Sequence, residues 1–274
     1  MAAIEGAEHE RKKQNVGFIR LILISLGIVL IWQVIVSVTG APPYILPGPV
    51  SVAEAAWAHS GSLFDHAMIT LFEIIVGLLL GTILGAFSAL SMIASLSLKR
   101  WLLPVLVISQ AIPVFALAPL LILWLGYGMS SKIAMAVLII FFPVTAAFYD
   151  GLRGTEPEWL ELAHVMNARP LSVIWHIRIP AALPAFASGL RVATAVAPIG
   201  AVVGEWVGSS KGLGFYMLHA NARMQIDIMF AALAVLAVVA LSLYFAVDRA
   251  MIKIVYWQQD NGLTTKAQGQ KEGI

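Results

Sequence analysis

The chain has 274 residues, of which 60% are hydrophobic and 12% charged, and its formal net charge is +2. A mean hydropathy of +0.88 leaves too little polar surface for a water-soluble globule of this size, so we expect a multi-spanning membrane protein. The absence of cysteine excludes disulfides, thiolate metal sites and cysteine nucleophiles, and the small net charge gives no indication of nucleic-acid binding.

Apolar runs long enough to cross a bilayer core of about 30 Å, which takes about 20 helical residues, recur along the chain. The six predicted spans are residues 16–38, 67–94, 102–125, 133–149, 183–203 and 228–252. We therefore predict an all-α membrane protein with six transmembrane helices in one membrane domain, residues 16–257, between tails at 1–15 and 258–274. The N-terminal segment carries three acids and lacks a small-residue cleavage site after the first apolar run, so we expect that run to be a retained span.

The distribution of Lys and Arg predicts the orientation of these spans. Most of these residues fall in the tails and in the connections on one side, while Lys132, Lys211 and Arg223 fall on the other. By the positive-inside rule, both termini are cytoplasmic.

Turn formers and glycines mark two features of the first half of the chain. Residues 41–51 hold four prolines and one glycine and are expected to be irregular and outside the hydrocarbon, followed by a short interfacial helix near 50–60. Gly77, Gly81 and Gly85 recur every four residues, which places them on one face of the second span and predicts close packing of another helix there.

A polar segment, residues 150–180, interrupts the apolar runs on the positively charged side. Thr155 and Glu158 fit a capping box, and the residues after them predict a short amphipathic helix that ends near Asn167. Its apolar stripe comprises Trp159, Leu160, Leu162, Ala163 and Met166. We expect the chain to restart after Pro170 and to stop at Pro180. Periodicity alone leaves two interpretations open, a helix resting on lipid headgroups and a helix docked on a cytosolic protein.

The same segment resembles the cytoplasmic coupling loop of bacterial ABC importer permeases. That loop reads E-A-A, three residues, Gly, nine residues and I-x-L-P, and this chain has Glu161-Leu162-Ala163, Asn167 and Ile177-Arg178-Ile179-Pro180 at the same spacing. Asn replaces Gly as the next-best residue for a left-handed helix stop. The resemblance implies that the ATPase-coupling residues are Glu161, Leu162, Ala163, Asn167, Ile177 and Pro180.

The resemblance extends over about residues 15 to 257 and is to the permeases of nitrate, taurine, alkanesulfonate and thiamine-pyrimidine-precursor importers. The landmarks include Leu46-Pro47-Gly48-Pro49, Ala111-Ile112-Pro113, Trp124-Leu125-Gly126-Tyr127-Gly128 and Glu205 followed by Gly212-Leu213-Gly214. It implies a type I ABC importer transmembrane domain in the bacterial plasma (inner) membrane.

The implied partners are two copies of an ABC ATPase, a periplasmic or lipid-anchored solute-binding protein and a second copy of this chain. Because the sequence has no G-x-x-x-x-G-K-[ST] motif, we expect no cofactor here, with ATP and Mg²⁺ on the ATPase.

Polar residues within apolar spans are costly and tend to face a cavity or another helix. The candidates are Glu73, Gln110, Arg191, Glu205 and Asp227. For the substrate pathway we choose Gln110 and Glu205 together with Pro113, Pro119 and Pro198, because prolines bend helices and free carbonyl groups. Glu73 and Arg191 could instead pair with each other.

A second polar group, at the predicted outer end of the last two spans, has two interpretations. It comprises Glu205, Trp206, His219, Asn221 and Arg223. This group is either a re-entrant gate or a docking surface for the binding protein.

These observations predict an importer permease and not an enzyme, since no catalytic pair has a suitable spacing. Within the resembling group, residues 204–238 most resemble the branch associated with hydroxymethylpyrimidine or formylaminopyrimidine uptake. Among the polar candidates, one arginine, Arg191, stands against the acids Glu73 and Glu205, and this balance leans away from an anionic solute. The alternatives are an alkanesulfonate, taurine or nitrate permease, and an ion-gradient secondary transporter using Glu73, Glu205 and Asp227.

Overall fold

The computed structural model describes residues 23–24 and 26–257, and this part of the chain is helical, without strands. The predicted tails 1–15 and 258–274, and the start of the first span, lie outside the described residues. A helix at Leu26–Thr39 comes first. The helices that follow are α2 (Pro49–Ala58), α3 (Ser60–Ala94), α4 (Leu96–Ala111), α5 (Val114–Leu125), α6 (Met129–Arg153), α7 (Pro157–Val165), α8 (Pro170–Val173), the π turn η1 (Ile174–Arg178), α9 (Ile179–Gly208), α10 (Leu213–Ala222) and α11 (Ile226–Ile254).

The chain divides into two compact units. The first unit combines residues up to Phe64 with Tyr216–Ala234, and the second combines Asp65–Phe215 with the chain from Val235 onward. Within the first unit, the ring centroids of Trp32 and Phe230 lie 5.7 Å apart, which joins the first helix to the start of α11.

Four helices of the described part are long and apolar enough to span a membrane: α3, α6, the continuous run Pro170–Gly208, and α11. A fifth span is formed if α4 and α5, which meet at a 106° bend, are counted as one. The helix at the first predicted span is short where it is described, so the structure supports four or five spans of the predicted six.

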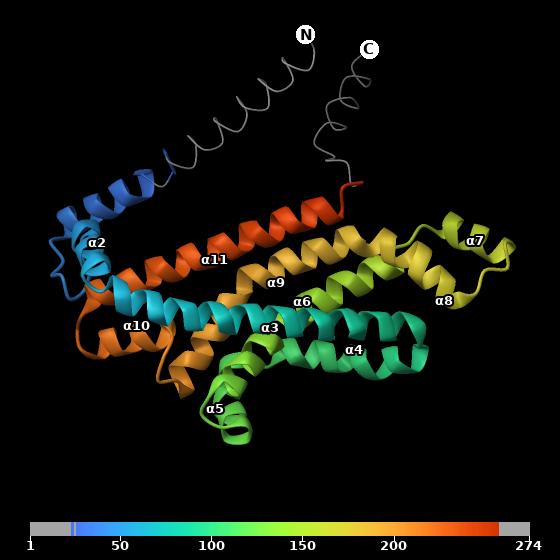
Figure 1. Ribbon diagram of the computed structural model, residues 1–274, viewed down its shortest axis with the longest axis horizontal. Coiled ribbons are helices and arrows are strands. Elements are labelled where there is room, and N and C mark those ends of the chain that lie inside the picture. The colour runs from blue at the N-terminus through green and yellow to red at the C-terminus, as the bar shows by residue number, and fades with distance from the viewer. Residues whose placement is uncertain (1–22, 25, 258–274) are drawn as a thin grey trace, which may run out of the picture. The chain divides into compact units, whose positions relative to one another are not determined.

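Proline explains the break in the third predicted span. Ile112, before Pro113, has φ −91° and ψ 120°, the extended conformation that the proline ring imposes on its predecessor. Figure 1 shows α5 turned away from α4 across this break. By contrast, α5 continues through Pro119 and α9 through Pro198, so two of the three predicted pathway prolines do not interrupt their helices.

The glycine stripe of α3 packs against α6, as predicted. A Cβ added at Gly77 would lie 2.5 Å from the Cβ of Ala136, one at Gly81 2.7 Å from Ile140, and one at Gly85 3.0 Å from Val144. Both sets of residues are four apart, so the two helices meet along one ridge over two turns. Close contact of this kind drives helix association in membranes, where lipid offers no hydrophobic gain.

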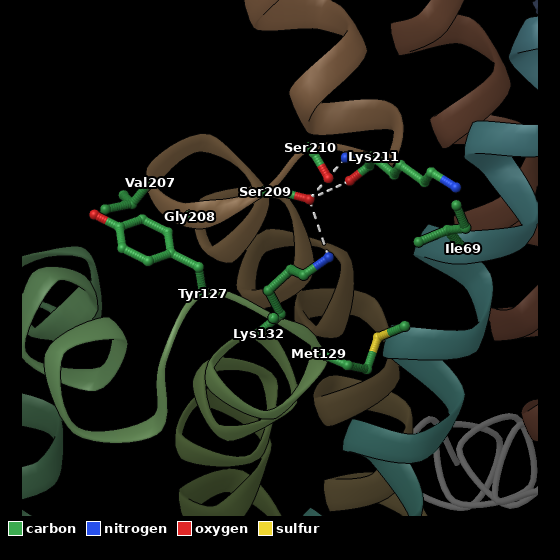
Figure 2. A pocket seen from close by; sticks show the side chains of 10 residues that line it. Ile69, Tyr127, Met129, Lys132, Val207, Gly208, Ser209, Ser210 and Lys211 are labelled. Carbon is green, nitrogen blue, oxygen red and sulfur yellow. Dashed lines mark hydrogen bonds between the residues drawn. The ribbon is translucent and has the colours of Figure 1, made fainter.

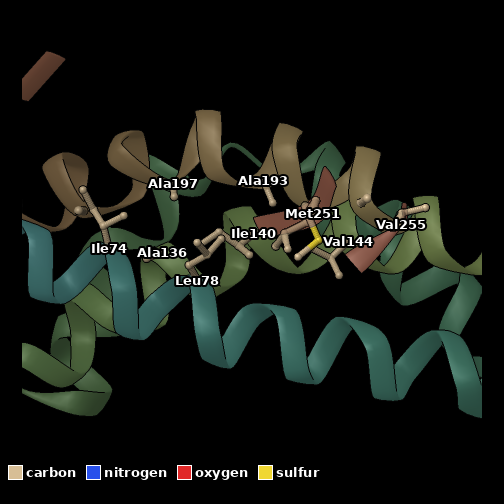
Figure 3. Close-up of a cluster of buried hydrophobic side chains, with 12 residues drawn as sticks. Ile74, Leu78, Ala136, Ile140, Val144, Ala193, Ala197, Met251 and Val255 are labelled. Carbon is tan, nitrogen blue, oxygen red and sulfur yellow. The ribbon is translucent and has the colours of Figure 1, made fainter. Parts of the chain in front are cut away.

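Small residues also bring α6 and α9 into contact along their length. A Cβ at Gly189 would lie 2.8 Å from the carbonyl oxygen of Pro143, and one at Gly200 would lie 2.7 Å from the Cα of Ala136. The core between α3, α6, α9 and the end of α11 is apolar (Figure 3). Its buried side chains include Ile74, Leu78, Ile140, Val144, Ala193, Ala197, Met251 and Val255.

The predicted stop at Pro180 is wrong, because α8, η1 and α9 form one helical run from Pro170 to Gly208. The π turn lies directly before Ile179 and Pro180. Its wider i→i+5 bonding accommodates a residue that lacks an N–H and carries a ring. The fourth span is also longer than predicted, since α6 has 25 residues.

Candidate functional site

A buried polar network joins α3, α6 and the end of α9. Lys132 Nζ lies 2.5 Å from Oε1 of Glu73 and donates to Oγ of Ser209 at 3.0 Å. Glu73 is fully buried and Lys132 nearly so, although the sequence placed Lys132 in an external connection. Its position near the first turn of α6 carries its side chain into the protein and not into solvent.

Thr70 and Glu205 hold the turn that follows α9. Oγ1 of Thr70 donates to Oε1 of Glu205 at 2.6 Å, and the backbone N–H of Leu213 donates to Thr70 at 2.8 Å. The N–H of Gly214 donates to Oε2 of Glu205 at 2.5 Å. Gly212 has φ +113°, and a Cβ there would collide with the Glu205 carboxyl group. The glycines therefore let the backbone wrap around a buried carboxylate.

The predicted pairing of Glu73 with Arg191 is wrong. Arg191 Nε instead lies 2.6 Å from Oδ1 of Asp248, which links α9 to α11. Glu73 is taken by Lys132, a partner from the helix against which the glycine face of α3 packs. Glu73 and Arg191 thus enter two separate ion pairs.

The break between α4 and α5 opens a hollow of about 460 Å³, which we call the Gln110 hollow. It is lined from α4 and the break by Ser109, Gln110, Ile112, Pro113 and Val114, from α6 by Ile139, Phe142 and Pro143, and from α9 by Val192, Val196 and Ile199. Gln110 and Pro113 therefore lie together at a hollow. Pro119, Pro198 and Glu205 are not part of its lining.

A second hollow, about 560 Å³ and here called the Tyr127 hollow, lies where the α5–α6 turn meets the α9–α10 turn. Figure 2 shows Tyr127, Lys132 and Ser209 around it, with Ser209 hydrogen-bonded to Lys132 and to Lys211. The sequence analysis did not identify this site. The only available signal was the landmark Trp124–Gly128, which ends in an aromatic residue between two glycines.

The segment between α6 and α9 forms the predicted short helix with a well-defined end. Asn167 has φ 54°, the N–H of Asn167 donates to the carbonyl of His164 at 2.9 Å, and the N–H of Ala168 donates to that of Ala163 at 2.9 Å. These two bonds with a left-handed residue are a Schellman stop. The predicted role of Asn167 in ending α7 is confirmed.

The predicted capping box at the other end of α7 is wrong. The helix begins at Pro157 with Glu156 as N-cap and no side-chain cap. Thr155 instead donates to the carbonyl of Leu152 at 3.1 Å, and so satisfies the end of the preceding helix α6. Proline at the first helical position fixes the start one residue later than the box requires.

The predicted coupling residues fall into two groups. Glu161 and Leu162 are exposed on α7, together with the neighbouring Val165 and Met166, whereas Ala163 is buried. Ile177 and Pro180 line a hollow of about 400 Å³ beneath the helix, with Trp159 and Trp257. The outward apolar face of α7 is available to a partner, and Ala163 packs inward.

The polar group at the end of the last two spans divides between the two units. Glu205 is buried in the network described above, so it cannot contribute to a docking surface. Trp206 lies with it in the second unit, whereas His219, Asn221 and Arg223 belong to the first.

The described part of the chain is all-helical, with several apolar spans, one broken span, and the short helix α7 between α6 and the run Pro170–Gly208. Such an arrangement is that of a multi-pass membrane protein. Comparison with known families defines which kind. The chain belongs to the family of binding-protein-dependent transport system inner membrane components, whose model matches residues 77–253.

Relatives and solved structures agree with this family. The chain is 56% identical to a probable ABC transporter permease protein of Haemophilus influenzae, over 85% of this chain and 96% of that one. It is 36% identical to the formylaminopyrimidine transport permease ThiX of Halalkalibacterium halodurans (86% and 95%) and 36% identical to the riboflavin transport permease RibX of Chloroflexus aurantiacus (84% and 87%). A chain of the inward-facing MetNI methionine ABC transporter shares the fold, with a TM-score of 0.58, 18% identity and coverage of 72% and 96%.

The chain is therefore a membrane-embedded permease subunit of an ABC importer, with the type I fold, and is not itself an enzyme. A permease of this family implies two kinds of partner, an ATPase and a solute-binding protein.

Proposed function

We propose that this permease carries a small, neutral, flat heteroaromatic solute, a thiamine pyrimidine precursor such as formylaminopyrimidine or hydroxymethylpyrimidine. The observation that carries this proposal is the chemistry of the Gln110 hollow. None of the described residues that line it is charged, and its polar side chains are Ser109 and Gln110. A hydroxyl and an amide recognise donors and acceptors on a ring, whereas a nitrate or sulfonate route favours a positive potential.

The charges near the spans do not alter this picture. Lys132 and Arg191 each lie against a carboxylate, at 2.5 Å and 2.6 Å, so neither cation is left to attract an anion. Two relatives at the same 36% identity are named for formylaminopyrimidine and riboflavin transport, and both names denote nitrogen heterocycles. Alkanesulfonate, taurine and nitrate are the competing substrates.

For coupling, we propose that α7 lies on the cytoplasmic side and docks on an ABC ATPase that binds ATP and Mg²⁺. Val165 and Met166 are 83% and 72% exposed at the C-terminal end of the helix, and Trp159 and Leu162 extend this apolar surface. α7 ends in a Schellman stop and is connected to α6 on one side and, through α8 and η1, to α9 on the other. A force on α7 can therefore be transmitted to both spans. The working assembly is a homodimer of this chain with two ATPase copies, fed by an external binding protein.

The test is uptake of labelled hydroxymethylpyrimidine or formylaminopyrimidine by the complex with its ATPase and binding protein in proteoliposomes. We expect uptake that requires ATP, with no uptake of taurine or nitrate. Uptake of either anion, with none of the pyrimidine, would overturn the substrate and leave the family assignment standing.

A matched pair of variants tests the hollow. Gln110→Leu removes its amide, and Gln225→Leu makes the same change at an exposed residue between α10 and α11. We expect Gln110→Leu to raise the KM for the pyrimidine at least several-fold and Gln225→Leu to leave it unchanged. Equal and negligible effects would remove Gln110 from the pathway.

A further inference from the structure

The Tyr127 hollow lies at the end of α6 and α9 opposite to the coupling helix α7. Met129 and Lys132 bring the first turn of α6 to it, and Val207 brings the last turn of α9 (Figure 2). The volume of about 560 Å³ is ample for a single-ring solute.

The groups around this hollow are suited to a ring that accepts hydrogen bonds. Tyr127 offers an aromatic face and is largely exposed, and Ser210 and Lys211 lie at the rim. Lys132 is 5% exposed at the hollow, and its ammonium group has three N–H donors, of which the two described bonds to Glu73 and Ser209 use two. One donor of a buried, fixed cation is thus left for a ligand.

The charge behind the hollow selects against an anion. Lys132 is ion-paired with the buried Glu73, and Glu205 is buried in the same polar network. With two acids behind one buried lysine, the exposed Lys211 does no more than balance the charge. A neutral acceptor can bond to Lys132 without needing a net positive field.

The Tyr127 and Gln110 hollows lie along the same faces of two helices. On α6, Lys132 of the first hollow and Ile139 and Pro143 of the second are seven and four residues apart, which are spacings of one helical face. On α9, Val192, Val196 and Val207 are likewise spaced by four and eleven residues. Ten residues of α6, from Lys132 to Phe142, correspond to about 15 Å along the helix axis.

We propose that the Tyr127 hollow is a solute subsite of this permease, for a neutral, flat, acceptor-bearing ring. A solute would stack on Tyr127 and accept a hydrogen bond from Lys132. Between the two hollows, α6 and α9 are in contact at Ala136 and Gly200, so passage to the Gln110 hollow requires these helices to separate. The identity of the ring rests on the proposed function, whereas the position of the subsite does not.

Because the chain has no cysteine, single introduced thiols report on this site without background. Ser210→Cys places a thiol at the rim, and Ser60→Cys places one at an exposed position on α3 that does not line the hollow. The rate of modification of each by a charged maleimide is measured on the complex in nanodiscs without the binding protein. The added solute is hydroxymethylpyrimidine, taurine or nitrate.

We expect hydroxymethylpyrimidine to slow modification of Ser210→Cys at least several-fold and saturably, with no effect on Ser60→Cys and no protection by either anion. Tyr127→Ala in the Ser210→Cys background should abolish the protection, and Tyr127→Phe should retain it. Lack of protection up to the solubility limit, in a complex whose wild type takes up the pyrimidine, would overturn the subsite while the proposed function stands. Protection by taurine or nitrate instead would overturn the neutral class.

Discussion

Lys132 Nζ lies 2.5 Å from Oε1 of Glu73, with the two side chains 6% and 0% exposed. The pair joins α6 to α3 at the end where the glycine stripe of α3 begins. Each of these buried charges is compensated by the other, because either one alone would be a buried, uncompensated ion.

We expect Lys132→Met to destabilise the protein by about 3–5 kcal/mol, because the Glu73 carboxylate loses its cation. The double variant Lys132→Met with Glu73→Leu should recover most of this loss. Thermal unfolding of the purified protein in detergent, followed by tryptophan fluorescence, measures both. A double variant no more stable than the single one would show that the two side chains act independently.

The Arg191–Asp248 pair should contribute much less. Its side chains are 30% and 28% exposed, so solvent and headgroups screen the attraction. Arg191→Ala should therefore cost roughly 1 kcal/mol or less, and the swap Arg191→Asp with Asp248→Arg should be tolerated. The same unfolding measurement applies. A loss as large as that of Lys132→Met would mean that a partner chain or lipid covers the pair.

Gly200→Ala should be strongly destabilising, because the new Cβ would lie 2.7 Å from the Cα of Ala136 and backbone cannot move aside. Overpacking of this kind costs typically about 1–3 kcal/mol. Gly61→Ala is the matched control, since a Cβ there meets nothing within 4 Å and the position is also helical. Size-exclusion profiles and melting temperatures report the difference. Equal behaviour of the two variants would contradict the close packing of α6 and α9.

On α7, Leu162→Arg should impair both binding-protein-stimulated ATP hydrolysis and transport without disturbing the fold. Leu162 is exposed, so the substitution removes no core contact, and under the proposed docking it removes a contact to the ATPase. Binding-protein-stimulated ATPase activity and ATP-driven uptake should both fall at least tenfold, with normal expression. Val50→Arg is the control, an equally exposed apolar position on α2. Normal uptake by Leu162→Arg would argue against docking through this face.

Local features were predictable from the sequence because neighbouring residues decide them. The spacing of Gly77, Gly81 and Gly85 fixed a packing face, Asn167 fixed a helix end, and Pro113 broke the third span. Each follows from backbone geometry within a few residues of the position itself.

Contacts between distant segments were not predictable in the same way. The partner of Glu73 lies 59 residues away on α6, and only the rotation of two helices decides that Lys132, and not Arg191, reaches it. The outcome at Pro180 was missed for a different reason, since proline usually ends a helix and the preceding π turn has no clear sequence signal. For the Gln110 hollow, the break at Pro113 was predictable because it is local. The walls that α6 and α9 contribute were not, because they come from distant parts of the chain.

The helical run Pro170–Gly208 has 39 residues, which corresponds to about 58 Å at 1.5 Å per residue. A bilayer with its headgroups is only about 40–45 Å thick. Held upright, this rod extends more than about 10 Å beyond the lipid. If the part of the run beyond the lipid lies at the Pro170 end, α7 lies in water beyond the headgroups. A large soluble protein could then contact α7 from several sides, and the thickness of the membrane would have little influence on that contact.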